Sequence, residues 1–454
     1  MPVKEATNDM RLRDIAIGAN ASMYYRLNFK KIRGVYYPKT ETDVLAAIAF
    51  ARENGYEVTP KGGGSGLSGA CTGGDTDRIM MSSLQMTEML AVSKDMGFVD
   101  VQPGLTPDEI NAVLEPLGMK LFVAPSSRDI ATVGGILSTD GGGNDTWVNG
   151  TMRDNTIKVK MVTYDGRRLT VSHEGVKSDD PDLEQELNKK GMTIHDVASS
   201  HGTLGFITEL KLAIRPLVNE SLVGSLAEFP DYDALGKAVD RMIKCKSPIR
   251  YGETIVMAHP DVREDFNPPL LILQYPEDYE SELKDFIDIK RLDKDEFERM
   301  KNIRIKLPKR NPKEGIQMAL FEGYGFHEGS LRNMQHTLDE IDALLRSSNL
   351  VPFAKYGHAP SKWYLGDNTA AYGIIMHSRE IRPEGKTGNQ LLKTILDIVE
   401  KCDSLGVTPK PEHKWPFDDK AKSARLNELR ETIGSGFNSF ILDEACNDVL
   451  SSMV

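Results

Sequence analysis

The chain has 454 residues, of which 40% are hydrophobic and 27% charged. This is ordinary globular usage, so a disordered chain is excluded, and at roughly 150 residues per domain we expect two or three domains. The formal net charge of -11 argues against a nucleic-acid partner, because a phosphate backbone would be repelled unless the basic residues were gathered on one face.

The cysteines exclude two further classes of protein. The chain has four cysteines, Cys71, Cys245, Cys402 and Cys446. They lie too far apart for an iron–sulfur or CxxC metal site and are too few for a secreted disulfide scaffold.

The sequence also lacks signals for secretion or membrane insertion. The N-terminus lacks an apolar signal-peptide core, and no stretch reaches the ~18 apolar residues of a membrane span. We therefore expect a cytoplasmic protein, with peripheral attachment to a membrane left open.

Capping signals predict two helices in the first part of the chain. One follows Thr40 and ends near Gly55, and the other begins at the Thr106-Pro107-Asp108-Glu109 capping box and ends near Gly118. β-rich runs are expected at residues 56–60, 97–102 and 157–163. The first half therefore mixes helices and strands.

The pattern changes near Pro216, where we expect a second domain to begin. Strands are expected at residues 222–229, 270–275, 317–324 and 368–376, and helices at 235–243, 331–345 and 391–399, with a highly charged segment at 277–310. This order suits an antiparallel sheet with helices on one face, and the fold class is α+β.

The densest signal is the glycine-rich run that follows the strand at residues 56–60. Gly64, Gly66 and Gly69 match G-x-G-x-x-G, but residues 70–75 are a poor helix start, so a Rossmann fold is rejected. The Gly385-Lys386-Thr387 triplet lacks the first glycine of a P-loop, since position 380 is glutamate. We interpret that triplet as a helix cap.

Three more glycine-rich stretches follow, at residues 131–135, 140–143 and 201–208. Any one of them alone fits a plain tight turn. Four in one domain favour backbone approaching an extended ligand at several points, with amide groups cradling a diphosphate.

Taken in order, the stretches at residues 60–69, 101–127, 131–143 and 201–216 resemble the FAD-linked oxidases of the vanillyl-alcohol oxidase/p-cresol methylhydroxylase superfamily. The similarity is greatest to the branch of D-lactate dehydrogenase, glycolate oxidase and D-2-hydroxyglutarate dehydrogenase. The resemblance implies an FAD-binding domain of the p-cresol methylhydroxylase type and an α+β cap domain on an antiparallel sheet. It places the FAD-binding domain at 1–218, the substrate or cap domain at 219–405, and a C-terminal segment that returns to the FAD domain at 406–454.

The resemblance also implies the cofactor contacts. The FAD-binding residues that it gives are Lys61, Gly62, Gly63, Gly64, Ser65, Gly66, Leu67, Ser68, Pro125, Ser126, Thr132, Gly134, Gly135, Thr139, Gly142 and Ile207. Relatives that bind the flavin covalently often use a histidine near the first loop, and residues 56–70 contain none. We therefore expect non-covalent FAD, with Cys71 a small buried residue.

In the second half, the motifs of the 2-hydroxy-acid branch match only in part. By resemblance, His358 and Glu412 are ligands of a divalent metal such as zinc, and His413 is the catalytic base. A neutral histidine suits proton removal from a hydroxyl near neutral pH, although His413 could also simply cap a helix or pack on Trp415. Arg304 is the candidate for binding the substrate carboxylate, with a solvated surface position as its alternative.

The expected activity is the FAD-dependent oxidation of a small 2-hydroxy acid, of the D-lactate or glycolate type, by hydride transfer to flavin N5. Three alternatives stay open: a superfamily member acting on an aromatic alcohol, one with an alkyl-dihydroxyacetone phosphate synthase-like substrate, and an FAD-holding electron-transfer subunit. The electron acceptor is unidentified, and the oligomeric state is open between a homodimer and a complex with a partner electron-transfer subunit.

Overall fold

The computed structural model describes residues 31–66, 70–71, 76–123, 125, 127–143, 146–217, 221–245, 247–258, 269–309, 317–325, 351–358, 370–378, 407–409 and 420–442. The chain divides into two compact units. The first comprises residues 1–141, 152–217 and 411–451, and the second comprises residues 142–151, 218–410 and 452–454. The expected helices at 331–345 and 391–399, and the Gly385 triplet, lie outside the described residues.

A small parallel sheet begins the first unit. Its strand order is β1-β3-β2, with β1 at Ile32–Tyr36, β2 at Glu57–Lys61 and β3 at Arg78–Ser82. Helix α2, Glu41–Glu53, connects β1 to β2 and buries Val44, Ala47, Ile48 and Ala51. The predicted cap of this helix is confirmed, because the Thr40 side chain accepts from the Asp43 amide.

A six-stranded antiparallel sheet forms the larger part of the first unit, in the order β4-β5-β10-β7-β8-β9. Its strands are β4 Met89–Ser93, β5 Phe98–Val101, β7 Thr156–Val162, β8 Arg168–Ser172, β9 Gly175–Ser178 and β10 Phe206–Ala213. A short ladder pairs β6, Met119–Lys120, with β11, Arg215–Pro216. The helices are α3 Pro107–Leu114, α4 Val133–Thr139, α6 Pro181–Lys189, α7 Ile194–Val197 and α13 Lys420–Ile433, with 3₁₀ turns η2 Ser83–Gln85, η3 Glu115–Leu117 and η7 Ser439–Leu442. The capping box predicted at Thr106 is confirmed at the start of α3.

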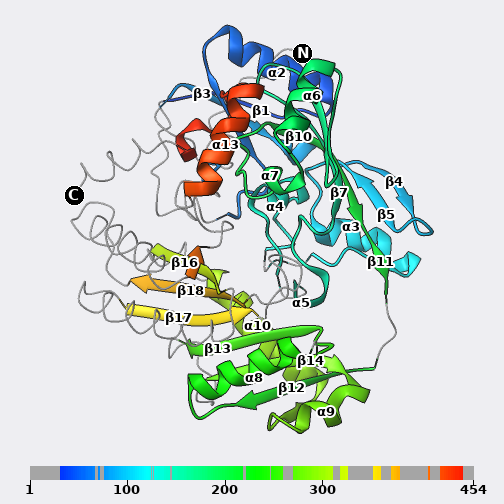
Figure 1. Ribbon diagram of the computed structural model, residues 1–454, viewed down its shortest axis with the longest axis vertical. Helices are drawn as coiled ribbons and strands as arrows, with labels where there is room; N and C mark the ends of the chain where they lie inside the picture. Colours follow the sequence, from blue (N-terminus) through cyan, green and yellow to red (C-terminus); the bar gives the residue numbers. More distant parts are fainter. Residues whose placement is uncertain are drawn as a thin grey trace. The chain divides into compact units, whose positions relative to one another are not determined.

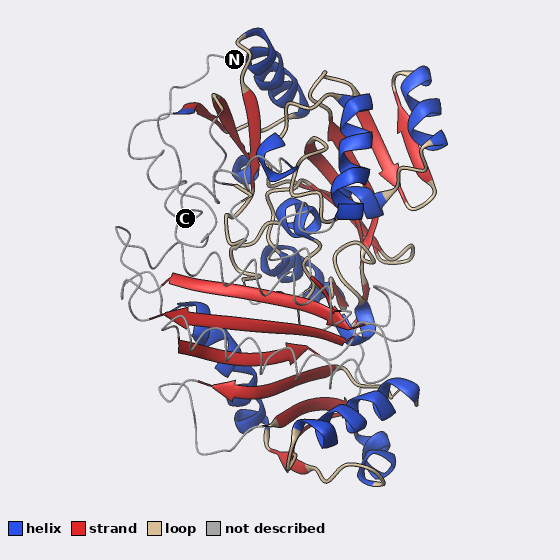
Figure 2. Cartoon of the chain, turned by 60° about the vertical axis from the view of Figure 1, so that its left-hand side comes forward, coloured by secondary structure: helices blue, strands red, loops and turns tan. Residues whose placement is uncertain are grey.

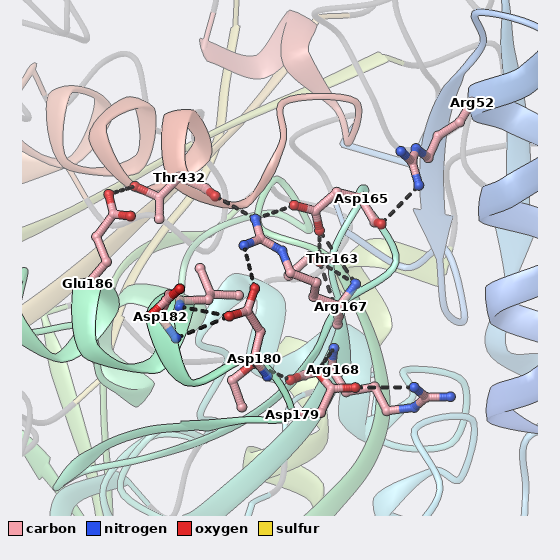
Figure 3. A network of polar contacts seen from close by, with 12 residues as sticks. Arg52, Thr163, Asp165, Arg167, Arg168, Asp179, Asp180, Asp182, Glu186 and Thr432 are labelled. Atoms are coloured by element: carbon pink, nitrogen blue, oxygen red, sulfur yellow. Dashed lines mark hydrogen bonds and ion pairs between the residues drawn. The ribbon is translucent and has the colours of Figure 1, made fainter.

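The C-terminal helix α13 packs into this first unit. Leu426, Leu429 and Ile433 are fully buried in its main hydrophobic core. Figure 3 shows the polar contacts beside this packing: Arg167, at the β7–β8 turn, donates to the carbonyl of Thr432 (2.7 Å) and contacts Asp165 and Asp180. Because apolar burial and this polar network act on the same helix, the C-terminal segment is held against strands far away in the sequence.

The second unit contains an eight-stranded sheet, in the order β15-β12-β14-β13-β17-β18-β16-β19, and every neighbouring pair is antiparallel (Figures 1 and 2). The strands are β12 Leu222–Glu228, β13 Tyr251–Ala258, β14 Leu270–Pro276, β15 Lys290–Leu292, β16 Gln317–Gly325, β17 Val351–His358, β18 Ala370–Ser378 and β19 Val407–Pro409. The described helices are α5 Thr146–Asn149, α8 Tyr232–Lys244, α9 Glu280–Lys284 and α10 Lys294–Lys309, with the 3₁₀ turn η4 Glu277–Tyr279. The expected α+β class with an antiparallel sheet is confirmed.

Both faces of the central strand β14 are covered. Leu270 and Ile272 belong to a hydrophobic cluster with Phe297 and Met300 of α10. Leu271 and Leu273, which alternate with them and so face the other side, are also fully buried. The uninterrupted apolar run of this strand suits burial on both sides.

Candidate functional site

Strand β2 leads directly into the first glycine-rich loop, and polar contacts hold its first residue. Glu57 lies 3.5 Å from the guanidinium of the buried Arg78 on β3 and also accepts from the hydroxyl of Ser439. At the other end of the strand, Lys61 is buried. The loop at residues 62–66 therefore begins from a fixed position.

This first loop packs against the second glycine-rich stretch. A Cβ added at Gly62 would collide with Oγ1 of Thr132, and one added at Gly63 would collide with the carbonyl oxygen of Ile130. Only glycine allows this close approach of two backbones. The first two glycine-rich stretches are thus in direct contact, although about 70 residues separate them in the sequence.

Thr132 begins helix α4 and organises the second stretch. Its buried side chain accepts from the Gly135 amide (3.4 Å). The amides of Val133 and Gly134 donate to the carbonyls of Leu105 and Pro103 (2.8 and 3.0 Å). Since a Cβ on Gly134 would lie 2.7 Å from Cβ of Pro103, glycine is required here by packing within the protein itself.

The fourth glycine-rich stretch reaches the same place. The His201 amide donates to the carbonyl of Ser138 in α4 (2.8 Å), and a Cβ on Gly202 would lie 3.0 Å from Cγ of Pro60. The buried Asn438 joins this stretch to the end of the first loop, because its Nδ2 donates to the carbonyls of His201 (2.9 Å) and Ala70 (3.1 Å). Three of the four glycine-rich stretches are therefore gathered around the end of β2.

Two glycines of the first loop differ from their neighbours in ways that suit a ligand. Gly64 has φ +70°, a left-handed conformation that turns the loop at low cost only with glycine. Among the described residues, a Cβ on Gly66 would meet no atom within 4 Å. The residues present therefore fit a diphosphate-containing cofactor, because backbone amides and a side-chain-free surface remain at the loop end.

The other predicted cofactor residues belong to several different elements of the fold. Thr139 hydrogen-bonds within α4, to the carbonyls of Gly135 and Ile136 (3.3 and 3.4 Å). Ile207 is buried in β10, and the carbonyl of Pro125 accepts from the Arg128 amide (3.0 Å) in the turn that leads to the second stretch. Gly142 belongs to the second unit, where a Cβ would collide with Cγ2 of Thr146. Ser65 is described in the first loop, whereas Leu67, Ser68 and Ser126 lie outside the described residues.

Cys71 is the thiol that follows the first loop, and it is partly exposed. Desolvation by the surrounding atoms raises the pKa of this thiol, while the charge of Lys61 acts in the opposite direction. A raised pKa keeps the sulfur protonated and weakly nucleophilic near neutral pH. This chemistry suits a structural cysteine better than a covalent flavin attachment.

The substrate-side candidates belong to the other part of the chain. His358 is the last residue of β17, and Arg304 lies in α10; the structure describes the backbone of both residues but not their side chains. Glu412 and His413 lie outside the described residues altogether. Among the residues that are described, no group of three histidine, cysteine, aspartate or glutamate side chains could hold a metal ion. The metal at His358 and Glu412 therefore stays a prediction.

Asn438 is the residue of the site that the sequence did not indicate. It lies in a segment without a glycine motif, and its contacts join residues that are 237 and 368 positions away. Its backbone φ of 43° is left-handed, a conformation in which asparagine is enriched. Left-handed backbone is not visible in a sequence, so no local signal could have identified this residue.

Comparisons with known proteins agree with this geometry. Residues 32–172 match the family described as "FAD binding domain". D-2-hydroxyglutarate dehydrogenase of Pseudomonas putida is 32% identical over 181 residues, which cover 38% of this chain and 17% of the relative. D-lactate dehydrogenase of Archaeoglobus fulgidus is 30% identical over 190 residues, or 42% of this chain and 40% of the relative. These matches thus span less than half of either relative's length.

The fold as a whole is similar to a solved structure of alkyldihydroxyacetonephosphate synthase. The TM-score is 0.66 at 14% identity, and the likeness covers 88% of this chain and 74% of that one. Together with the match of residues 32–172 to an FAD-binding domain, it confirms the expected resemblance to FAD-linked oxidases. In the part of the chain that the structure describes, no helix is long and apolar enough to cross a membrane.

Proposed function

We propose that this protein oxidises a small 2-hydroxy acid, of the D-lactate or glycolate type, with non-covalent FAD as the hydride acceptor. The observation that carries the proposal is the meeting of three glycine-rich stretches at the end of β2, within the residues that match an FAD-binding domain. The relatives named D-lactate and D-2-hydroxyglutarate dehydrogenase favour a 2-hydroxy acid as the substrate.

The roles of the chain's own residues follow from the chemistry of that reaction. When bound, FAD supplies a hydride acceptor at N5. Arg304 binds the substrate carboxylate through paired N–H donors, and His413 accepts the hydroxyl proton as the α-hydrogen departs with its electron pair. The product is then a 2-oxo acid, and one proton remains on His413. His358 and Glu412 are proposed ligands of a divalent metal beside the substrate.

Reduction of the flavin by substrate is the direct test of this function. Under anaerobic conditions, D-lactate, glycolate or D-2-hydroxyglutarate should bleach the flavin absorbance near its visible maximum, because no acceptor then reoxidises it. The panel should include a phenolic alcohol and an acyl-dihydroxyacetone phosphate. Bleaching by one of these, with none by any 2-hydroxy acid, would move the protein to another branch, and no bleaching by any compound would favour an electron-transfer subunit.

The non-covalent attachment predicts a simple extraction result. Acid precipitation should release intact FAD into the supernatant, because residues 56–70 contain no histidine and the pKa of the Cys71 thiol is raised. Absorbance spectra of the supernatant and the redissolved pellet measure the distribution. Flavin that stays with the pellet, in wild type but not in Cys71→Ser, would show a bond to that sulfur.

Arg304→Lys tests the proposed carboxylate contact. Lysine keeps the positive charge but loses the planar pair of donors, so the KM for the 2-hydroxy acid should rise about tenfold, equivalent to about 1.4 kcal/mol. The FAD content of the purified protein should not change. An unchanged KM would instead place Arg304 on the solvated surface of α10. The cytoplasmic location stays a prediction, and the electron acceptor stays unidentified.

A further inference from the structure

Glu253 is a buried carboxylate in the second unit that neither the motifs nor the proposed function uses. It lies on β13, is 2% exposed, and accepts a 2.5 Å hydrogen bond from the hydroxyl of Tyr251 through Oε2. A carboxylate removed from water in this way is costly unless charged or hydrogen-bonding groups surround it. Its surroundings therefore indicate what it stabilises.

The register of the sheet places Glu253 beside His358. The two residues are directly opposite each other in the antiparallel β13–β17 pair. Opposite residues of such a pair lie on the same face of the sheet, with Cβ atoms about 5 Å apart. In the other direction Glu253 is opposite Ile272 of β14, a member of the cluster under α10. Glu253 and His358 thus stand on the face that α10 covers.

Helix α10 crosses this face diagonally. It connects β15 to β16. Six antiparallel strand pairings separate these two strands in the sheet, and each pairing reverses the direction, so β15 and β16 are parallel. The helix therefore runs from the β15 edge toward the opposite half of the sheet. Its contacts follow this course: a Cβ on Gly224 of β12 would collide with Phe297, while Nζ of Lys301 lies 5.4 Å from the ring centroid of Tyr251 on β13.

Arg304 occupies the next position along the same stripe of the helix. Phe297 and Met300 are buried against the sheet, and Arg304 follows them at i+7 and i+4, so it belongs to the same helix face. β13 and α10 run in the same direction. One helix turn beyond Lys301 therefore advances about as far as the two-residue step on β13 from Tyr251 to Glu253. The topology therefore brings the positions of Glu253, His358 and Arg304 to one region of one face.

We propose that Glu253 is a positioning residue that fixes the guanidinium of Arg304 for binding the substrate carboxylate. The inference rests on the proposed function. Glu253 itself does not touch the substrate. An arginine bound on one edge by a buried carboxylate keeps its other N–H donors in a fixed plane, and this pre-organisation lowers the cost of ordering it when an anion binds. Tyr251 fixes the carboxylate in turn.

The test compares Glu253→Gln with Glu298→Gln, the same charge neutralisation on the half-exposed side chain that pairs with Lys301 in α10. For D-lactate with an artificial dye as acceptor, Glu253→Gln should raise KM about tenfold and change kcat less than about threefold, because only binding is impaired. The dissociation constant of oxalate, a carboxylate that cannot be oxidised, should rise in parallel. Glu253→Asp should recover part of the loss, and FAD content should stay at the wild-type value in all variants.

Coupling between the two residues separates a positioning role from a purely structural one. If Glu253 acts through Arg304, adding Arg304→Lys to Glu253→Asp should raise KM by much less than the product of the two single effects. This cycle also serves if Glu253→Gln does not fold. The inference would be wrong if the KM effects of the two single substitutions multiply in the double variant. It would also be wrong if Glu253→Gln and Glu298→Gln have the same KM. Neither result would contradict the proposed function. If the wild-type protein neither oxidises 2-hydroxy acids nor binds oxalate, both the inference and the proposed function are wrong.

Discussion

Gly66→Val should abolish FAD retention and leave the apoprotein folded. A Cβ at this position meets no atom of the described part of the chain within 4 Å, so the substitution adds no collision with these residues. The valine side chain would instead fill the space where a diphosphate meets the loop backbone. We expect the affinity for FAD to fall at least about 100-fold, equivalent to about 2.7 kcal/mol. The flavin-to-protein ratio after gel filtration and the fluorescence titration of stripped protein with FAD measure it.

Gly63→Ala is the matched contrast in the same loop. Here the added Cβ would collide with the carbonyl oxygen of Ile130, which is backbone and cannot rotate away. We expect the free energy of unfolding of the apoprotein to fall by about 1–3 kcal/mol, as for other overpacked sites. Gly66→Val stripped of flavin should instead melt at the temperature of the stripped wild type. A Gly66→Val variant that keeps its FAD would show that the diphosphate lies elsewhere.

The local elements could be predicted from the sequence because their signals are local. The cap at Thr40 and the capping box at Thr106 predicted the starts of α2 and α3, since each depends on residues no more than three positions apart. The strand at residues 56–60 was displaced by one residue in the structure, where β2 is Glu57–Lys61. Such shifts are expected because a strand end is set by its partners.

The site could be predicted only as a set of glycine-rich stretches, without the contacts between them. The sequence attributes these glycines to a ligand, whereas Gly62, Gly63 and Gly134 each have a packing reason inside the protein. That reason depends on Ile130, Thr132 and Pro103, and a sequence does not show which distant backbone approaches a loop. For the same reason the pairing of Glu253 with His358 required the sheet register.

Asn438→Ala should weaken both the fold and the retention of FAD, because this residue joins two of the glycine-rich stretches. Its Nδ2 donates to the carbonyls of Ala70 and His201, and its backbone amide donates to the carbonyl of Val58 (3.1 Å). Alanine would leave the two side-chain-bound carbonyls without this donor, at about 1 kcal/mol or more each. Alanine would also occupy the left-handed backbone at φ 43° without the short polar side chain that lets asparagine adopt it, and this conformation costs about 1–2 kcal/mol for a residue other than glycine, asparagine or aspartate.

Two further substitutions at this position separate the backbone from the amide. Asn438→Gly relieves the left-handed strain but lacks the donor, whereas Asn438→Asp keeps the shape and turns a carboxylate oxygen toward two carbonyl oxygens. We therefore expect the free energy of unfolding to fall by about 3 kcal/mol for alanine, less for glycine and most for aspartate, as measured by urea denaturation of the FAD-bound proteins. FAD affinity should follow the same order, since the Asn438 amide contacts both Ala70, which follows the first glycine-rich run, and His201 of the fourth. If the alanine variant unfolds and binds FAD as the wild type does, the side chain of Asn438 does not hold these loops together.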